Sequence, residues 1–452
     1  MAAQDPGQSQ AIALPKTGQW RFGAQAMHPF AVPGLPPREA AGPAFLLARL
    51  APAGVQKKLP CMMRPSAGPP FFLFLSRTTT PQHNTENMGF QCGIVGLPNV
   101  GKSTIFNALT SAAIQAENYP FCTIEPNIGI VPVPDERLDR LANLVHTRNK
   151  VPTQMEFVDI AGLVRGASRG EGLGNQFLAH IRQVDAIIHV VRCFENDNIV
   201  HVDGSVDPLR DVSVINTELI LADLESVDKR LARTKNQAKS GNRTLIAELA
   251  MLERLQAHLS AGEPARTFVC KDEQHQGVMR ELCLLSAKPV LYVANVSEDE
   301  LAGGNAHVAA LERVATGEKA ELVRIAGAIE QEIAQLAPEE QKEYLAELQM
   351  AEPGLHRLIR AGYRLLELIT FFTVGEKETK AWTISQGTKA PGAAGKIHSD
   401  FERGFIRAEV IAYKDYMACG SEAAARDKGL MRSEGKDYEV KDGDCILFRF
   451  NV

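Results

Sequence analysis

A run of eight residues, from Gly96 to Ser103, constrains the fold of this chain more than any other feature. It reads Gly-Leu-Pro-Asn-Val-Gly-Lys-Ser and matches GxxxxGK(S/T), with an apolar strand pattern before it (92–95) and a helical pattern after it. Glycines let backbone N–H groups converge on a polyphosphate, and the helix N-terminus adds partial positive charge. The run therefore predicts a P-loop in an α/β domain whose sheet is mostly parallel.

The polar residues of this run each have an expected partner. Lys102 contacts the β- and γ-phosphates, which makes it a candidate catalytic residue, and the hydroxyl of Ser103 ligates Mg²⁺. Asn99 either stabilises the turn or helps to hold a monovalent cation such as K⁺ through its amide oxygen. The residues predicted here to bind nucleotide are Asn99, Val100, Gly101, Lys102, Ser103 and Thr104.

Two further segments have the pattern of a nucleotide switch. A strand pattern ends at Asp159, which can hold Mg²⁺, usually through water, and Gly162 can offer its N–H to the γ-phosphate. Thr123 lies in the preceding loop and is expected to ligate Mg²⁺ only when a triphosphate is bound; otherwise it is an ordinary loop hydroxyl. The neighbouring Cys122 either couples oxidation to this site or is a buried, inert thiol.

The residue after Gly162 bears on hydrolysis. Many switch GTPases place Gln there to orient the attacking water, whereas this chain has Leu163, which cannot do so. Either hydrolysis is very slow or another group supplies that function. His201, at the end of the polar stretch 195–201, is a candidate with suitable chemistry, and a histidine that only packs against a loop is its alternative.

A fourth segment bears on the choice of base. The strand pattern 289–295 ends in Asn295-Val296-Ser297-Glu298, where GTP-specific switches have Asn-Lys-x-Asp. The short Asp carboxylate of that pattern accepts two hydrogen bonds from guanine, and Glu298 is one methylene longer. Adenine has no N1–H, so Asn295 and nearby backbone groups can read it instead. A missing hydrogen-bond pattern shifts selectivity by several kcal/mol, in order of magnitude, and we therefore expect ATP over GTP.

Composition excludes several classes of protein. The 452 residues carry a net charge of −5, so any contact with nucleic acid must come from a local patch. No stretch approaches the roughly 20 apolar residues that cross a bilayer, and we expect a cytoplasmic protein without a membrane partner. The eight cysteines form no CxxC pair and no cluster with histidine, which argues against a disulfide scaffold and a structural zinc site.

Residues 1–87 differ from the rest of the chain. They hold 13 of the 25 prolines and show no sustained helical or strand period, so we expect a disordered extension. The segment is either an organellar transit peptide or upstream sequence that the working protein lacks. Sparse serine and dense proline favour the second alternative.

Two regions follow or interrupt the nucleotide-binding domain. Residues 216–260 show two leucine-rich helical stripes, one of which includes Leu221, and basic residues cluster between them. This pattern suits a projecting helical hairpin whose basic tip contacts RNA phosphates, or else a solvated helix face. Residues 367–452 alternate apolar strand patterns with a turn-rich segment at 387–395 and indicate a small separate module.

The motifs together resemble the YchF/Obg-like ATPase family from residue 88 to residue 452. The resemblance rests on the segments 96–103, 121–127, 157–164 and 170–177 and on Asn295-x-x-Glu298. It implies a P-loop NTPase domain (88–215 and 286–366), a helical, coiled-coil-like insert (216–285) and an α+β TGS domain (367–452). It also implies a ribosome-associated ATP switch, linked to redox stress or translation, that contacts the large subunit or the 70S particle, with an rRNA contact, through the insert and the TGS domain.

Two other functions compete with the ATPase switch. An Obg-type GTPase in ribosome assembly would share the P-loop, and Glu298 speaks against it. A nucleotide-binding scaffold with incidental turnover would be compatible with Leu163. Competition between nucleotides separates the first from the ATPase, and stimulation of turnover by a partner separates the second.

Overall fold

The computed structural model describes residues 90–115, 127–160, 173–270 and 272–451. The extension 1–87, Thr123 with its neighbour Cys122, and Gly162 with its neighbour Leu163 lie outside these residues. None of the helices in the described ranges combines the length and the apolarity that a membrane crossing requires.

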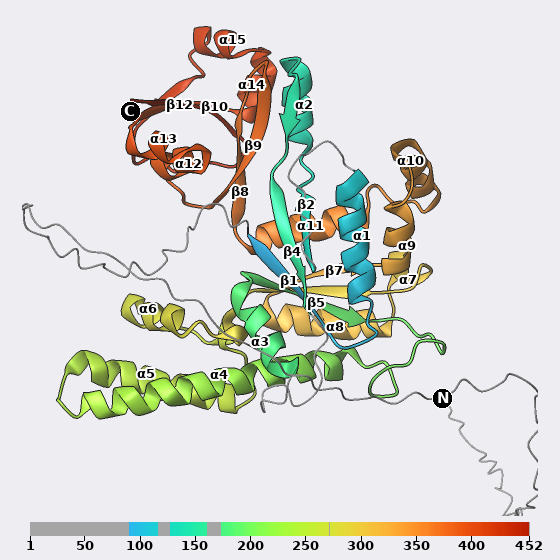
Figure 1. The fold of residues 1–452 in the computed structure, drawn as a ribbon, viewed down its shortest axis with the longest axis vertical. Coiled ribbons are helices and arrows are strands. Elements are labelled where there is room, and N and C mark those ends of the chain that lie inside the picture. The colour runs from blue at the N-terminus through green and yellow to red at the C-terminus, as the bar shows by residue number, and fades with distance from the viewer. Residues whose placement is uncertain (1–89, 116–126, 161–172, 271, 452) are drawn as a thin grey trace, which may run out of the picture. The chain divides into compact units, whose positions relative to one another are not determined.

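A six-stranded sheet forms the core of the nucleotide-binding domain (Figure 1). Its strand order is β2-β4-β1-β5-β6-β7, and every neighbouring pair is parallel except β2 with β4. The central strands β5 and β6 are buried along their whole length, as expected of mostly apolar strands in the middle of a parallel sheet. The predicted α/β fold is confirmed. The strands are β1 (Gln91–Val95), β2 (Ile128–Pro132), β4 (Gln154–Asp159), β5 (Ala186–Arg192), β6 (Val290–Asn295) and β7 (Glu321–Ile325).

Helices follow most of these strands, as the crossovers of a parallel sheet require. Because the parallel strands share a direction, the segments after β1, β4, β6 and β7 meet at one edge of the sheet, where ligands bind in such folds. The helices of this domain are α1 (Lys102–Gln115), α3 (Leu173–Gln183), α7 (Glu300–Gly303), α8 (Ala306–Glu318), α9 (Gly327–Ile333), α10 (Pro338–Glu347) and α11 (Gly354–Leu365).

The insert is a long antiparallel helical hairpin (Figure 1). It consists of α4 (Pro208–Ala238) and α5 (Arg243–Ser260), followed by α6 (Glu273–Leu282) and flanked by short 3-10 turns at Ala265–Thr267 and Leu285–Ala287. The boundary predicted at residue 216 falls inside α4. Leu221 is 42% exposed and Ile220 is buried instead, so the predicted stripe is wrong there. Adjacent helical residues lie about 100° apart, and a shift of one residue therefore moves the buried face.

The C-terminal module is built on a second six-stranded sheet, of order β11-β10-β12-β8-β9-β3. Residues 390–395, predicted to be turn-rich, are instead helical, because their alanines pack into the core of this module. Its strands are β8 (Leu368–Thr373), β9 (Glu378–Ser385), β10 (Phe405–Ala412), β11 (Arg432–Glu434) and β12 (Asp444–Phe450). Its helices are α12 (Ala390–Ile397), α13 (Ser399–Arg403), α14 (Tyr413–Cys419) and α15 (Glu422–Asp427).

One strand of this second sheet comes from the first third of the chain. The short strand β3 (Asn149–Val151) pairs in parallel with β9. The preceding helix α2 (Glu136–Leu144) buries Leu138 and Leu141 against Phe372 and Ala381 of the module. The two sheets are therefore joined by a segment that the sequence patterns assign to the nucleotide-binding domain alone.

Candidate nucleotide-binding site

The loop between β1 and α1 has the backbone of a phosphate cradle. Asn99 and Gly101 have φ values of 62° and 96°, so two N–H groups are turned out of the ordinary chain direction. A Cβ atom at Gly101 would lie 2.1 Å from Nδ2 of Asn295, and one at Gly96 would lie 2.4 Å from the carbonyl oxygen of Val190. Both positions therefore require glycine, whereas asparagine tolerates the left-handed region at position 99.

Lys102 closes this loop in the present structure. Its Nζ donates to the carbonyl oxygen of Leu97 at 2.8 Å, and the residue is 8% exposed. Burial lowers the pKa of the amine, and the nearby carboxylate of Asp159 partly opposes that shift. The cation thus lies over the cradle with one weak, replaceable partner, which is the position from which it would reach a bound phosphate.

Ser103 and Asp159 form a site that fits Mg²⁺. Oγ of Ser103 lies 3.5 Å from Oδ2 of Asp159, and Oδ1 of Asp159 is buried with no hydrogen-bond partner among the described residues. Burial raises the pKa of this carboxyl, while Lys102 and Ser103 lower it. A buried carboxylate oxygen without a partner is costly unless a cation or water meets it. Mg²⁺ prefers such oxygen ligands and completes its shell with water and substrate phosphates.

Asn295 lies at the same edge but is engaged with the protein. Its Nδ2 donates to the carbonyl oxygen of Val100 at 2.9 Å, and its Oδ1 accepts from the N–H of Gly327 at 3.0 Å. An amide nitrogen carries two hydrogens, so one N–H remains for a purine. Val296 is buried with its N–H bound to the carbonyl of Ile325, and Glu298 has an exposed side chain.

Gly327 also belongs to this site, although no sequence pattern predicted it. This residue begins α9 directly after β7, and a Cβ atom there would lie 3.3 Å from Oδ1 of Asn295. The available signal was a small residue at the carboxyl end of a parallel strand, which is too common to identify a site without the topology.

His201 lies beside the cradle, but both of its ring nitrogens are engaged. Nε2 lies 2.9 Å from Oδ2 of the buried Asp211, and Nδ1 accepts from the N–H of Asp203 at 3.2 Å. The acceptor role of Nδ1 places the ring proton on Nε2, which donates to Asp211. The preceding residue, Val200, accepts from Nδ2 of Asn99 at 3.1 Å. The loop with His201 therefore contacts the P-loop, although orienting a water would require one ring nitrogen to leave its partner.

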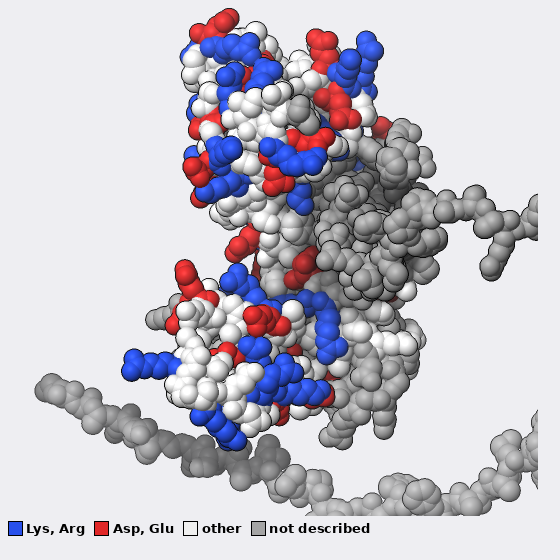
Figure 2. Space-filling model, turned by 60° about the vertical axis from the view of Figure 1, so that its left-hand side comes forward, with Lys and Arg blue, Asp and Glu red and all other residues white. Residues whose placement is uncertain are grey.

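The helical hairpin presents basic side chains with few acidic neighbours. Figure 2 shows Lys and Arg projecting from the surface of the molecule, with Asp and Glu among them. Lys229 pairs with Glu225, and Arg230 pairs with Glu248. Among the described residues, no acidic partner is found for four exposed members of the cluster, which are Arg233, Lys235, Lys239 and Arg243.

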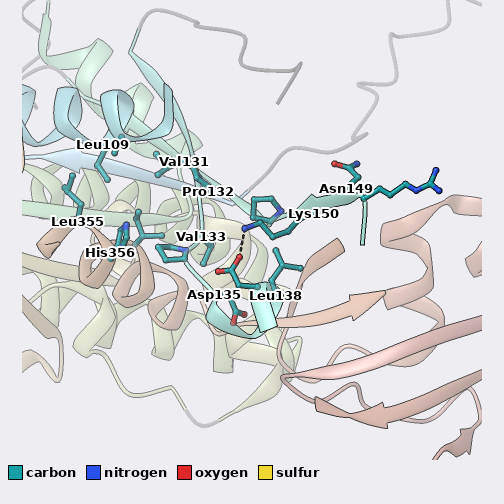
Figure 3. A pocket seen from close by; sticks show the side chains of 16 residues that line it. Leu109, Val131, Pro132, Val133, Asp135, Leu138, Asn149, Lys150, Leu355 and His356 are labelled. Atoms are coloured by element: carbon teal, nitrogen blue, oxygen red, sulfur yellow. Dashed lines mark hydrogen bonds and ion pairs between the residues drawn. The ribbon is translucent and has the colours of Figure 1, made fainter. Parts of the chain in front are cut away.

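A cavity of about 560 Å³ lies away from the P-loop, where α2 and β3 leave the nucleotide-binding domain (Figure 3). Leu109, Val131, Leu355 and Ile359 line its apolar side, and Lys150 forms an ion pair with Asp139 at its rim. No residue predicted to bind nucleotide or metal lines this cavity. This cavity is therefore separate from the predicted nucleotide site.

Comparisons with known proteins agree with this geometry. Residues 91–237 match the family described as "50S ribosome-binding GTPase", and residues 368–451 match the C-terminal YchF-GTPase family, described as "Protein of unknown function". The chain is 55% identical over 367 residues to "Ribosome-binding ATPase YchF" of Bacillus subtilis (strain 168), which covers 81% of this chain and 100% of that protein.

Two further relatives match over nearly the same share of the chain. "Ribosome-binding ATPase YchF" of Haemophilus ducreyi is 56% identical over 366 residues, again 81% of this chain and 100% of the relative. The solved structure of the Schizosaccharomyces pombe YchF GTPase superposes with a TM-score of 0.74 at 38% identity and covers 80% of this chain and 98% of that one.

Proposed function

The chain belongs to the YchF family, and from that premise we propose that it is an ATP-hydrolysing switch that binds the ribosome. The observation that carries the proposal is the grouping of Lys102, Ser103 and Asp159 around the strained loop 96–101. These groups supply a cation, a hydroxyl and a buried carboxylate oxygen, which are the parts that a nucleoside triphosphate with Mg²⁺ requires.

The residues of the cradle act by binding and positioning. The N–H groups of the loop receive the phosphate oxygens, and Lys102 exchanges the carbonyl of Leu97 for a phosphate oxygen. Ser103 and Asp159 would hold Mg²⁺, which would supply positive charge to neutralise the phosphates. Thr123 and Gly162 remain the predicted sensors of the γ-phosphate.

We propose that the base pocket prefers adenine. One N–H and the oxygen of the Asn295 amide are bonded to the protein. The side chain of Glu298 is exposed and is longer than the Asp of guanine-specific switches. The names of the relatives differ here, because the bacterial proteins are named ATPases and the S. pombe structure is named a GTPase. Competitive binding of ATP and GTP with Mg²⁺ tests the proposal. A preference for ATP of about tenfold, roughly 1.4 kcal/mol, supports it, and a preference for GTP overturns it in favour of an Obg-type GTPase.

His201 is the proposed water-orienting residue. It adjoins Val200, whose carbonyl already touches the P-loop, and its release from Asp211 would free Nε2. The K⁺ predicted at Asn99 is a separate proposal, in which the amide oxygen binds the ion while Nδ2 stays on Val200. Replacement of K⁺ by Na⁺ or Cs⁺ in the turnover assay tests it, and equal rates in all three salts contradict it.

The proposed ribosome contacts are the helical hairpin and the C-terminal module. The basic side chains of the hairpin would bind rRNA phosphates, and the proposed location of the protein is the cytoplasm. Four exposed cations without acidic partners suit phosphate binding, whose strength falls as salt rises. Co-sedimentation with 70S ribosomes in ATP and in ADP tests this proposal. Binding that does not depend on the nucleotide would favour a scaffold over a switch.

A further inference from the structure

Arg192, the last residue of β5, is a buried cation without an acidic partner. It is 1% exposed, and no ion pair of its guanidinium with a carboxylate is found among the described residues. A buried charge is costly unless hydrogen bonds compensate it. The guanidinium must therefore be stabilised by neutral hydrogen-bond acceptors. The position of these acceptors in the chain shows which segment Arg192 fixes.

All three of its recorded acceptors are backbone carbonyls of the loop that follows β5. Nε donates to Phe194 at 3.1 Å, one terminal nitrogen donates to Ile199 at 2.9 Å, and the other donates to Asn196 at 3.1 Å. The guanidinium also lies over the ring of Phe194, with Cζ 4.7 Å from its centroid. A planar fork bonded at three points fixes the orientation of a loop as well as its distance.

The residues directly after this clamp contact the nucleotide cradle. Val200 accepts from Asn99 of the P-loop at 3.1 Å, and His201 follows it. The far side of the loop is held at α4, where Asp211 binds the ring of His201. The loop therefore has attachments at the sheet, at the P-loop and at α4, and Arg192 provides the attachment to the rigid sheet.

We infer that Arg192 is a positioning residue, which sets the loop 194–201 so that His201 stands beside the γ-phosphate end of the cradle. The inference rests on the proposed ATP hydrolysis and on the proposed role of His201. Misplacement of a catalytic group by about 1 Å can lower the rate roughly a hundredfold. The three hydrogen bonds from Arg192 to this loop should therefore affect the rate as well as the stability of the loop.

Arg192→Lys tests the inference, because it keeps the charge and loses the fork. We expect kcat for ATP to fall about ten- to a hundredfold, while the Kd for ATP stays within about twofold. In a His201→Ala background the same substitution should change kcat by less than about twofold, since it acts through His201. Arg137→Lys is the matched control, because Arg137 also bonds through three nitrogens, but it is more exposed and its acceptors are the carboxylates of Asp135 and Asp442.

Two outcomes would overturn the inference: an unchanged kcat in Arg192→Lys, or an equal fall in both backgrounds. Turnover by the unsubstituted chain tests the proposed function separately, so a failure of the Arg192 inference alone can be recognised. Should Arg192→Lys fold poorly, Arg192→Gln removes the buried charge together with the fork and should give the same loss of kcat. Hydrogen exchange over 194–201 then reports whether the loop has loosened, and unchanged protection in both variants also contradicts the inference.

Discussion

Asn295 ties the P-loop to the loop after β7, because its one amide group donates to the carbonyl of Val100 at 2.9 Å and accepts from the N–H of Gly327 at 3.0 Å. The residue is 5% exposed, so water does not compete for either bond. Gly101 and Gly327 leave it room, since a Cβ atom at either would crowd its amide. The cradle thus owes part of its shape to a residue nearly 200 positions away.

Asn295→Ala should therefore damage the site and the fold together. It leaves a buried carbonyl and a buried N–H without partners, each of which costs about 1–3 kcal/mol. We expect the free energy of unfolding to fall by about 2–4 kcal/mol and the Kd for ATP to rise at least tenfold, in order of magnitude. Urea unfolding and equilibrium nucleotide binding measure the two effects. Glu298→Ala, on the exposed side of the same segment, should leave stability within about 0.5 kcal/mol, and a similar loss in both variants would argue against this role.

Asp159→Asn should weaken the binding of the Mg²⁺ that supports ATP binding. The substitution removes the charge of a half-buried carboxylate whose Oδ1 has no partner in the part of the chain that the structure describes. We expect the Mg²⁺ concentration for half-maximal ATP binding to rise about 10- to 100-fold, as for other residues that act on a metal through water. EDTA should abolish the difference between the variant and the unsubstituted chain. Glu156→Gln on the same strand is the control, because Glu156 bonds to Gln91 at the far end of β4. Equal Mg²⁺ titrations for both variants would contradict a metal site at Asp159.

The sequence predicted the parts of the site that depend on local order. A P-loop is a continuous segment between a strand and a helix, and its identity follows from eight residues. Asp159 and Asn295 lie at the same edge of the sheet because both end parallel strands that share a direction. These positions could be predicted because each requires only one strand and the residues directly after it.

The parts that were missed depend on contacts between distant segments. No pattern in residues 149–151 shows that β3 pairs with β9 in another module, because three residues carry no period. The engagement of both nitrogens of His201 was equally hidden, since Asp211 is one of many acidic residues near it in sequence. Only the fold shows that the charge of Arg192 is met by backbone carbonyls of the loop that follows β5.

Leu141→Ala should loosen the junction of the two sheets. Leu141 of α2 is fully buried in a cluster with Phe372 and Ala381 of the C-terminal module. Removal of a buried leucine side chain costs about 2–5 kcal/mol, with the larger values where the cavity does not collapse. We expect a loss of this size in urea unfolding, and ATP binding to the native state should change little because the P-loop is elsewhere. Leu209→Ala, at a residue that is 46% exposed, should cost less than about 0.5 kcal/mol. Equal losses in the two variants would show that α2 is not part of a shared core.

His189→Gln should remove a pH dependence of stability that originates beneath the P-loop. His189 lies in β5 between β1 and β6, is 2% exposed, and its ring centroid lies 5.5 Å from that of Tyr292. Burial lowers its pKa to about 3, and the positive charges of Arg266 and Lys102 add to the shift. The unfolded chain binds this proton near pH 6.5, so the stabilisation is complete above that pH and is lost as the pH falls towards 3. Over this window the loss is about 1.4 kcal/mol per pH unit for one proton.

The measurement is urea unfolding at several pH values between 7 and 4 for the unsubstituted chain and the variant. The difference in unfolding free energy should be constant above pH 6.5 and should shrink below it, because glutamine has no proton to gain. His356→Gln serves as a comparison, since burial also lowers the pKa of His356. The difference in unfolding free energy between the unsubstituted chain and this variant should likewise shrink as the pH falls below 6.5. Parallel pH curves for the unsubstituted chain and His189→Gln would mean that His189 takes up its proton at the same pH in the folded and the unfolded chain, which contradicts the lowered pKa.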